Sequence, residues 1–173
     1  MKMITYNTQL LMKSQEDFDS LKSILDMHKV VFNYASPLQF IEKKNSLVVL
    51  HSKVYYNVRK QYPNIPSQVI IRAEQECLSS YKSTKSNKYK LKKPIQKQKL
   101  SIRLDKRLYS KDKNDKYLIK ITTINGSQPF KFVVYPKLKE LLDKYQHRDP
   151  LIYENSIKIF ISFSFDTKPK DKL

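Results

Sequence analysis

A strand pattern isolated at the N-terminus constrains the fold more than any other feature of this sequence. Residues 3–12 read MITYNTQLLM, and Ile4, Tyr6, Thr8 and Leu10 share one parity, as a half-buried strand requires. A long stretch with helical periodicity separates this segment from the next strand pattern. Because a lone strand is not stable, the first strand must pair with strands from the second half of the chain. The helical part is therefore expected to be an insertion into a β domain.

Three helices are predicted in that insertion. The first follows Ser14, whose hydroxyl suits an N-cap, and it ends or turns at Pro37, because proline disrupts a helix interior. The second follows the capping pair Asn45-Ser46. The third begins with Ser67 as its N-cap, after a proline-containing turn.

Beyond residue 99 the hydrophobic period changes from helical to two. The clearest pattern is SIKIFISFSF at 156–165, which predicts one strand with its apolar side chains on a single face: Ile157, Ile159, Ile161, Phe163 and Phe165. Further strands are predicted at 100–104, 116–124 and 129–135, and a helix begins at Pro136.

These elements predict an α+β fold. Five or six strands close their edges most simply as a small antiparallel β-barrel of the oligonucleotide-binding kind, with the helical bundle inserted after the first strand. The predicted divisions are a β-barrel of residues 1–13 and 99–167, a helical insert at 14–82, a basic loop at 83–98 and a C-terminal tail at 168–173.

The charge of the chain points to its partner. Lys and Arg number 34 against 16 Asp and Glu, which gives a net charge of +18. A polyanion relieves the resulting self-repulsion, because each neutralised phosphate also releases counterions. Residues 81–100, YKSTKSNKYKLKKPIQKQKL, hold eight lysines and no acid. Nucleic acid is therefore the first partner to consider, and an anionic membrane surface the second.

Several classes of site find no support in the sequence. Cys77 is the only cysteine, so one chain can form neither a disulfide nor a cysteine-based metal site, and a reducing cytoplasm is expected. Gly126 is the only glycine, which excludes glycine-rich phosphate loops and dinucleotide fingerprints. His28, His51 and His147 are too scattered to predict a metal site. No run is apolar enough for a membrane span, and we expect no cofactor.

One segment resembles a known family. Residues 62–83 read YPNIPSQVIIRAEQECLSSYKS, which is similar to the loop-helix block of the TnpB/OrfB transposon-associated proteins, relatives of the type V CRISPR effectors. Those proteins have a Leu-Pro or Ile-Pro pair, then a glutamine-bearing helix that runs into Tyr-Lys and a basic loop. The ending VVFNYAS at 30–36 and the last strand before Asp166 resemble the family as well.

The resemblance implies an architecture and a function. The family's N-terminal half is a wedge-like barrel with a helical recognition insert, which holds a guide-RNA scaffold and reads a short DNA motif beside the target. Its C-terminal half is a RuvC-like nuclease with a zinc ribbon. This sequence stops at Leu173, where the first acidic strand of the nuclease is expected, and it has no Asp–Glu–Asp constellation or CxxC pair. We therefore expect no cleavage by this chain alone.

The resemblance also assigns residues to DNA-motif reading. Gln68 matches the family's base-reading glutamine, which can pair bidentately with adenine. Asn64 and Ile65 lie where the family has a polar reader and an apolar base contact, and Arg72 and Gln75 could contact phosphate. The alternatives are an exposed glutamine at a helix start, turn chemistry for Asn64 and a solvated helix face.

The lysine-rich stretch is assigned to the nucleic-acid backbone. Lysines are point charges that suit phosphates and carry no base-reading geometry, although a solvated loop is the alternative. The predicted backbone contacts are Lys82, Lys85, Lys88, Lys90, Lys92, Lys93, Lys97, Lys99, Arg103, Lys106 and Arg107.

Three functions follow in order of support. The first is a nucleic-acid-binding module without its own cleavage activity. The second is one half of a split RNA-guided endonuclease, completed by a separate RuvC-bearing chain, and its mark would be an exposed apolar surface at residues 160–165. The third is a structural or regulatory protein docked on anionic membranes, which ranks last because no clean basic amphipathic helix is present.

Overall fold

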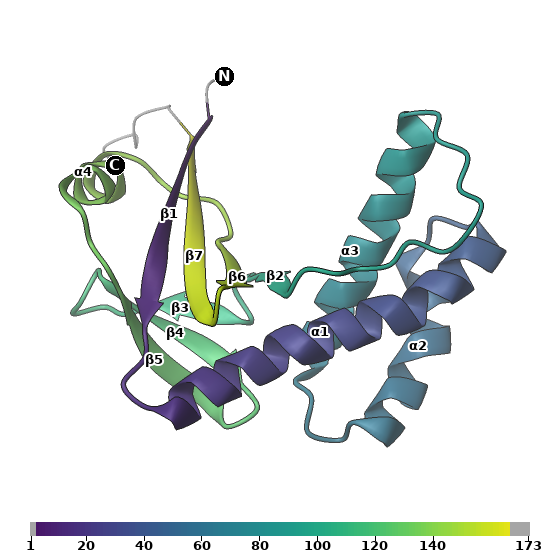
Figure 1. The fold of residues 1–173 in the computed structure, drawn as a ribbon, viewed down its shortest axis with the longest axis horizontal. Helices are drawn as coiled ribbons and strands as arrows, with labels where there is room; N and C mark the ends of the chain where they lie inside the picture. The colour runs from purple at the N-terminus through teal and green to yellow at the C-terminus, as the bar shows by residue number, and fades with distance from the viewer. Residues whose placement is uncertain (1–2, 167–173) are drawn as a thin grey trace. The chain divides into compact units, whose positions relative to one another are not determined.

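The computed structural model describes residues 3–166, which form an α+β fold (Figure 1). The tail predicted at 168–173, and residues 1, 2 and 167 of the predicted barrel, lie outside the described residues. The chain divides into two compact units. Met1–Lys22 and Arg103–Leu173 make up one, called the β unit here, and Ser23–Ile102 make up the other, called the helical unit.

The strands form one curled antiparallel sheet in the order β2-β6-β7-β1-β5-β4-β3. Their bounds are β1 Met3–Leu11, β2 Ser101–Arg103, β3 Tyr109–Lys111, β4 Leu118–Thr123, β5 Gly126–Phe132, β6 Leu151–Asn155 and β7 Lys158–Asp166. The predicted strands at 100–104, 116–124 and 129–135 correspond to β2, β4 and β5. Neither β3 nor β6 was predicted, since β3 has only three residues and LIYEN of β6 does not alternate.

The first strand pairs with strands from the far end of the chain, as predicted. β1 runs antiparallel to β7, from Met3 opposite Asp166 to Gln9 opposite Phe160, and its end reaches β5, where Leu10 lies opposite Phe132. The parity of β1 is also confirmed, because its buried residues are Thr8 and Leu10.

The prediction for the last strand holds for four of its five apolar residues. Ile159, Ile161, Phe163 and Phe165 are buried at 1% exposure or less. Ile157 was assigned to the same face but is 82% exposed. Ser156 and Ile157 form the two-residue turn between β6 and β7, and both have positive φ, 50° and 61°, as a type I′ hairpin requires.

Helix α4, Pro136–Lys144, begins with proline at its first position, as predicted. Its buried residues are Leu138 and Leu141. Helix α1, Gln15–Glu42, belongs to the β unit as far as Lys22, and there the Ser20 hydroxyl donates to the side-chain oxygen of Gln128 on β5 at 2.7 Å.

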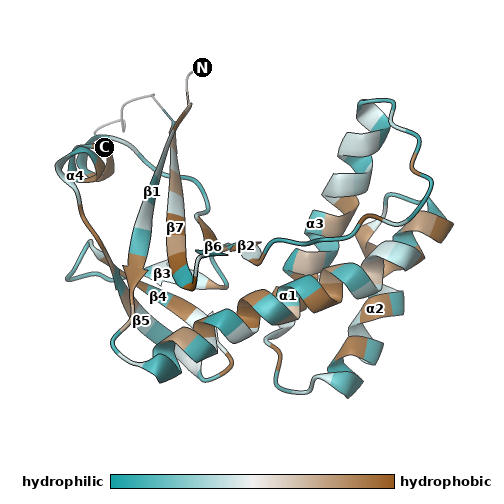
Figure 2. Cartoon of the chain, viewed as in Figure 1, coloured by the Kyte–Doolittle hydropathy of each residue, from teal (hydrophilic) through white to brown (hydrophobic). Residues whose placement is uncertain are grey.

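The helical unit contains the rest of α1 together with α2, Leu47–Gln61, and α3, Ser67–Ser86. All three helices carry apolar and polar bands (Figure 2). Two predicted caps are confirmed: the Ser14 hydroxyl accepts from the Asp17 N–H at 3.1 Å, and the Ser46 hydroxyl caps α2. Buried side chains from α2 and α3 form the core between these helices, among them Val54, Val58, Ile70 and Ala73.

Two helix boundaries differ from the sequence expectation. Helix α1 continues through Pro37 to Glu42, because the surrounding turns are held by packing: Phe32, Ala35 and Ser36 are almost fully buried. Ser67 is the first helical residue of α3 rather than its cap. Its hydroxyl lies 3.0 Å from the Tyr55 hydroxyl of α2 instead.

Candidate nucleic-acid interface

The lysine-rich stretch begins as helix. Helix α3 continues to Ser86, so the first four residues of the predicted basic loop, 83–86, are helical. The helix then ends in a Schellman motif: the Tyr89 N–H donates to the Thr84 carbonyl and the Lys88 N–H to the Lys85 carbonyl, both at 3.0 Å. Lys88 occupies the left-handed position of this motif, with φ 58°. That position usually holds glycine, because a Cβ atom there crowds the backbone.

Replacing Lys88 by glycine is therefore expected to stabilise the helical unit by about 1 kcal/mol while removing one positive charge. Urea unfolding measures the difference. Lys90→Gly is the matched control, because it removes the same charge from a residue that does not have positive φ. An equal effect of both substitutions on the free energy of unfolding would contradict the strain assigned to Lys88.

Side chains of α1 and α3 bind the backbone of the segment that follows. The Asn33 amide donates to the Lys97 carbonyl at 3.1 Å, and the Asn33 carbonyl oxygen accepts from the Lys97 N–H at 2.8 Å. The Ser36 hydroxyl donates to the Ile95 carbonyl at 2.6 Å. The Tyr81 hydroxyl donates to the Ser36 carbonyl at 2.9 Å and accepts from the Ile95 N–H at 3.2 Å. These contacts fix residues 95–97, and we call Asn33, Ser36 and Tyr81 the clamp.

Lys97 was predicted to contact phosphate, but the structure places it inside the helical unit. Its side chain is 6% exposed, and its ammonium group donates to Glu76 Oε1 at 2.5 Å and to the Ser101 carbonyl at 2.8 Å. Burial lowers the pKa of Lys97, and the Glu76 carboxylate opposes that shift. The positive charge of Lys97 is thus used to fix the segment to α3, and it is not available at the surface.

Two histidines lie beside the acidic residues of α3. His28 on α1 lies with Nε2 3.4 Å from Glu76 Oε2, and burial, with a smaller effect of the Lys97 charge, holds the pKa of His28 well below its usual value. The Glu74 carboxylate is fully buried and lies 2.7 Å from His51 Nδ1. Burial raises the pKa of Glu74, and the hydrogen bond from His51 opposes that rise. Both acids of α3 therefore have a basic side chain of the same unit as a partner.

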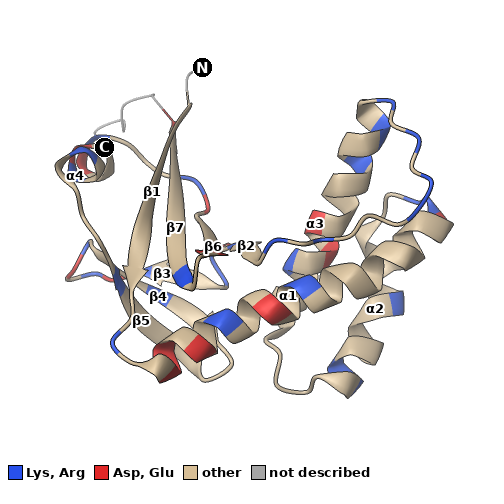
Figure 3. Ribbon diagram, in the orientation of Figure 1, with Lys and Arg blue, Asp and Glu red and all other residues tan. Residues whose placement is uncertain are grey.

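The remaining lysines of the run are exposed. They are Lys82, Lys85, Lys88, Lys90, Lys92, Lys93 and Lys99. Within the part of the chain that the structure describes, none of these seven lies within ion-pair distance of a carboxylate. Residues 77–104 contain no acid, and the helical unit as a whole has 15 basic and 4 acidic residues, a net charge of +11. Figure 3 shows basic residues on the last turns of α3 and along the segment after it.

The residues assigned to DNA-motif reading lie at the opposite end of α3. Asn64 is exposed in the turn before the helix, and the Arg59 guanidinium holds that turn by donating to the Pro63 carbonyl at 3.1 Å. Gln68 is half-buried on the first turn of the helix. With a rise of about 1.5 Å per residue, Gln68 and Lys85 are separated by about 25 Å along the helix axis.

The other residues assigned to DNA-motif reading are Arg72, Gln75 and Ile65. The Arg72 guanidinium donates to the side-chain oxygen of Gln75 at 2.8 Å, so these two residues form one half-buried pair on α3. Ile65 was expected at a base contact, but its side chain is 1% exposed. The structure therefore places Ile65 in the core of the helical unit, and its side chain is not presented to a ligand in this conformation.

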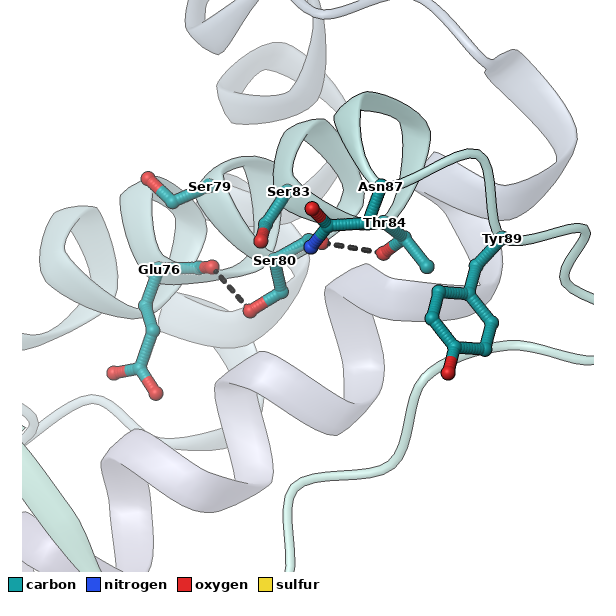
Figure 4. Close-up of a pocket in the computed structure, with 7 residues that line it drawn as sticks. All are labelled: Glu76, Ser79, Ser80, Ser83, Thr84, Asn87 and Tyr89. Carbon is teal, nitrogen blue, oxygen red and sulfur yellow. Dashed lines mark hydrogen bonds between the residues drawn. The ribbon is translucent and has the colours of Figure 1, made fainter.

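A shallow groove that was not predicted from the sequence runs along α3. It is lined by Glu76, Ser79, Ser80, Ser83, Thr84, Asn87 and Tyr89. Tyr89 lies at one end of the row and the Glu76 side chain at the other (Figure 4). The Ser80 and Thr84 hydroxyls donate to carbonyls one turn earlier. The recurrence of small hydroxyl residues every three or four positions was the signal available in the sequence.

The remaining predicted backbone contacts belong to the β unit. Arg103, Lys106 and Arg107 are exposed. The Arg103 guanidinium donates to the Asp149 carbonyl at 2.9 Å. The structure thus divides the predicted set of basic residues between two units, and the lysine-rich stretch belongs to the helical one.

The mark expected for a split nuclease is not seen in β7. Phe163 and Phe165 are buried in the β unit, and Phe160 stacks on Tyr153 of β6 with ring centroids 5.6 Å apart. In residues 3–166 no group of three or more His, Cys, Asp or Glu side chains is arranged to hold a metal ion. Burial raises the pKa of the Cys77 thiol to about 12, so it is not a reactive thiolate. No helix in the same residues has the length and apolar content needed to cross a bilayer.

Comparison with protein-family models and with curated proteins finds no match to this chain. The exposed lysines at the C-terminal end of α3 and in the segment after it are the feature of the described residues with the most direct chemical meaning.

Proposed function

We propose that this chain is the nucleic-acid-binding module of a TnpB-like protein, and that it binds a guide-RNA scaffold, target-adjacent duplex DNA or both. The observation that carries the proposal is the set of seven exposed lysines at 82–99, which have no carboxylate within ion-pair distance among the described residues. Such a surface is costly in isolation and is neutralised most effectively by a row of phosphates. Cleavage is not part of the proposed function of this chain.

The proposed roles divide along α3. The lysines at its C-terminal end and in the following segment provide affinity that does not depend on sequence, because they meet phosphates. Asn64 and Gln68 at the N-terminal end read base edges, and the Arg72–Gln75 pair contacts the adjacent backbone. A separation of about 25 Å along the helix is compatible with one ligand that reaches both ends, since a duplex rises about 3.4 Å per base pair.

The finer features of the fold belong to the same proposal. The curled sheet would act as a barrel of the oligonucleotide-binding kind, and the three helices between β1 and β2 as its recognition insert. Arg103, Lys106 and Arg107 would extend the contacts to the β unit. A cytoplasmic location suits such a protein, because its ligands are found there.

Titration with labelled nucleic acid tests the proposal. Fluorescence anisotropy is measured with a duplex DNA of about 20 base pairs and with a hairpin RNA, each at about 50 and 200 mM salt. Five or more phosphate contacts predict a fall in affinity of about 100-fold or more across that range. No binding at the lower salt concentration, or an affinity that changes less than about threefold, would contradict the proposal.

A further inference from the structure

The lysine-rich segment 88–93 is fixed at both of its ends. On one side the Schellman motif sets the direction in which the chain leaves α3, through the hydrogen bonds donated by Lys88 and Tyr89. On the other side the clamp holds residues 95–97, and Lys97 is anchored to Glu76. Lys88, Lys90, Lys92 and Lys93 are exposed between these two anchors.

We propose that this segment is a preformed phosphate-binding surface, and that Asn33, Ser36 and Tyr81 are positioning residues for it. This inference rests on the proposed function. It adds that the affinity depends on the conformation of the segment as well as on its charge. None of the three positioning residues carries a charge, so each acts through the backbone of residues 95–97 and not through the ligand.

The hydrogen bonds of the clamp explain why the affinity depends on the conformation of the segment. Among the described residues, no strand pairs with residues 95–97. The backbone N–H and carbonyl groups of Ile95 and Lys97 bond to side chains of α1 and α3 instead. A tether of the same charge without these bonds would lose conformational freedom each time it bound a polyanion. The cost of ordering is about 0.5–1.5 kcal/mol for each immobilised group, so a preformed segment binds more tightly than a free one.

The composition of the segment indicates contact through charge. Tyr89 is the only aromatic residue between Tyr81 and Tyr109. Sequence-tolerant binding of single strands uses several aromatic side chains on which successive bases stack. With one aromatic residue and four exposed lysines, the segment suits the sugar-phosphate backbone rather than the bases. The spacing between the lysine charges then contributes more to the affinity than stacking does.

The test separates conformation from charge. Tyr81→Phe removes one hydroxyl that makes contacts to Ser36 and Ile95, and it leaves the net charge unchanged. Tyr55→Phe is the matched control, because it removes a hydroxyl that contacts Ser67 in the same unit. Ser36→Ala is the second clamp variant and is measured beside Tyr81→Phe, and circular dichroism checks that each variant is folded.

Two quantities are measured for each variant. Trypsin cleavage of the free protein after Lys88, Lys90 or Lys92 reports whether the segment is held, and it is expected to be about tenfold faster in the clamp variant than in the wild type and the control. The affinity for the duplex and hairpin RNA probes is expected to fall about three- to tenfold in the clamp variant, with an unchanged salt slope.

The possible results separate a failure of the clamp to affect binding from a failure of the protein to bind nucleic acid. Faster cleavage with unchanged affinity would overturn the inference and leave nucleic-acid binding intact. Unchanged cleavage in both clamp variants would overturn it as well, since the clamp would not hold the segment. If the wild type binds neither probe, the proposed function fails together with the inference, although the cleavage rates still report the clamp itself.

Discussion

Replacing Lys88, Lys90, Lys92 and Lys93 together by glutamine is expected to weaken nucleic-acid binding about 30-fold at about 0.1 M salt. Exposed charge pairs contribute about 0.5 kcal/mol each, and four of them amount to about 2 kcal/mol. The magnitude of the salt slope should also fall by up to about 3.6, because each phosphate contact in a duplex contributes about 0.9. Anisotropy titrations over a range of salt concentrations measure both quantities.

The matched control removes the same charge from the other unit. Lys113 and the three lysines of α4, Lys137, Lys139 and Lys144, are exposed and lie outside the helical unit. Their replacement by glutamine lowers the net charge equally, and it should change the affinity less than about threefold. Equal losses in the two quadruple variants would show that net charge alone, rather than the segment, determines binding.

Removal of the Glu76 carboxylate is the substitution expected to cost the most stability. In Glu76→Ala the ammonium group of Lys97, which is 6% exposed, keeps only the Ser101 carbonyl among its hydrogen-bond partners. Removal of one partner of an ion pair destabilises by about 3 kcal/mol or more when the charge left behind is buried, as that of Lys97 is. Urea unfolding of the variant measures the loss.

Removal of the other partner, Lys97, is expected to cost much less stability. Lys97→Met removes the buried charge, and Glu76, whose side chain is 39% exposed, can be hydrated instead. We expect a cost below about 1 kcal/mol, and the double variant Glu76→Ala/Lys97→Met should be more stable than Glu76→Ala alone. Equal costs for the two single substitutions would contradict the asymmetry in burial.

The instability of Glu76→Ala should also depend on pH. Burial already lowers the pKa of Lys97 below 10.5 with Glu76 present, and without that carboxylate the pKa falls further. Between the folded-state pKa and 10.5 the unfolded chain binds more protons than the folded one, so stability rises with pH in that window. The deficit relative to the wild type is therefore expected to shrink from about pH 7 to about pH 9.5.

Local sequence patterns predicted the elements of the fold well where the pattern itself determines the structure. The alternation in β1 and β7, the caps Ser14 and Ser46, and the proline that begins α4 all depend on residues near one another in sequence. The failures depend on tertiary contacts. Helix α1 continues past Pro37 because of packing around that residue, and Ile157 is exposed to solvent because it lies in the β6–β7 turn.

The candidate site was predictable in composition but not in structure. Exposure of most of the lysines follows from their density, since a cluster of like charges cannot be buried. Burial of Lys97 depends on Glu76, 21 positions away, and the clamp joins Asn33 to Lys97 across 64 positions. Contacts of this kind leave no local periodic signal, so the sequence predicted a loop where the structure has a segment held to α1 and α3.

Protection of lysines from acylation tests the central claim most directly. The wild-type chain is treated with an amine-reactive reagent, free and with a saturating amount of the duplex or hairpin RNA, and each site is quantified by mass spectrometry. The account predicts that Lys88, Lys90, Lys92 and Lys93 react at least about fivefold more slowly in the complex, whereas Lys137 and Lys139 of α4 are unchanged. Binding that leaves the four lysines as reactive as in the free chain would contradict it.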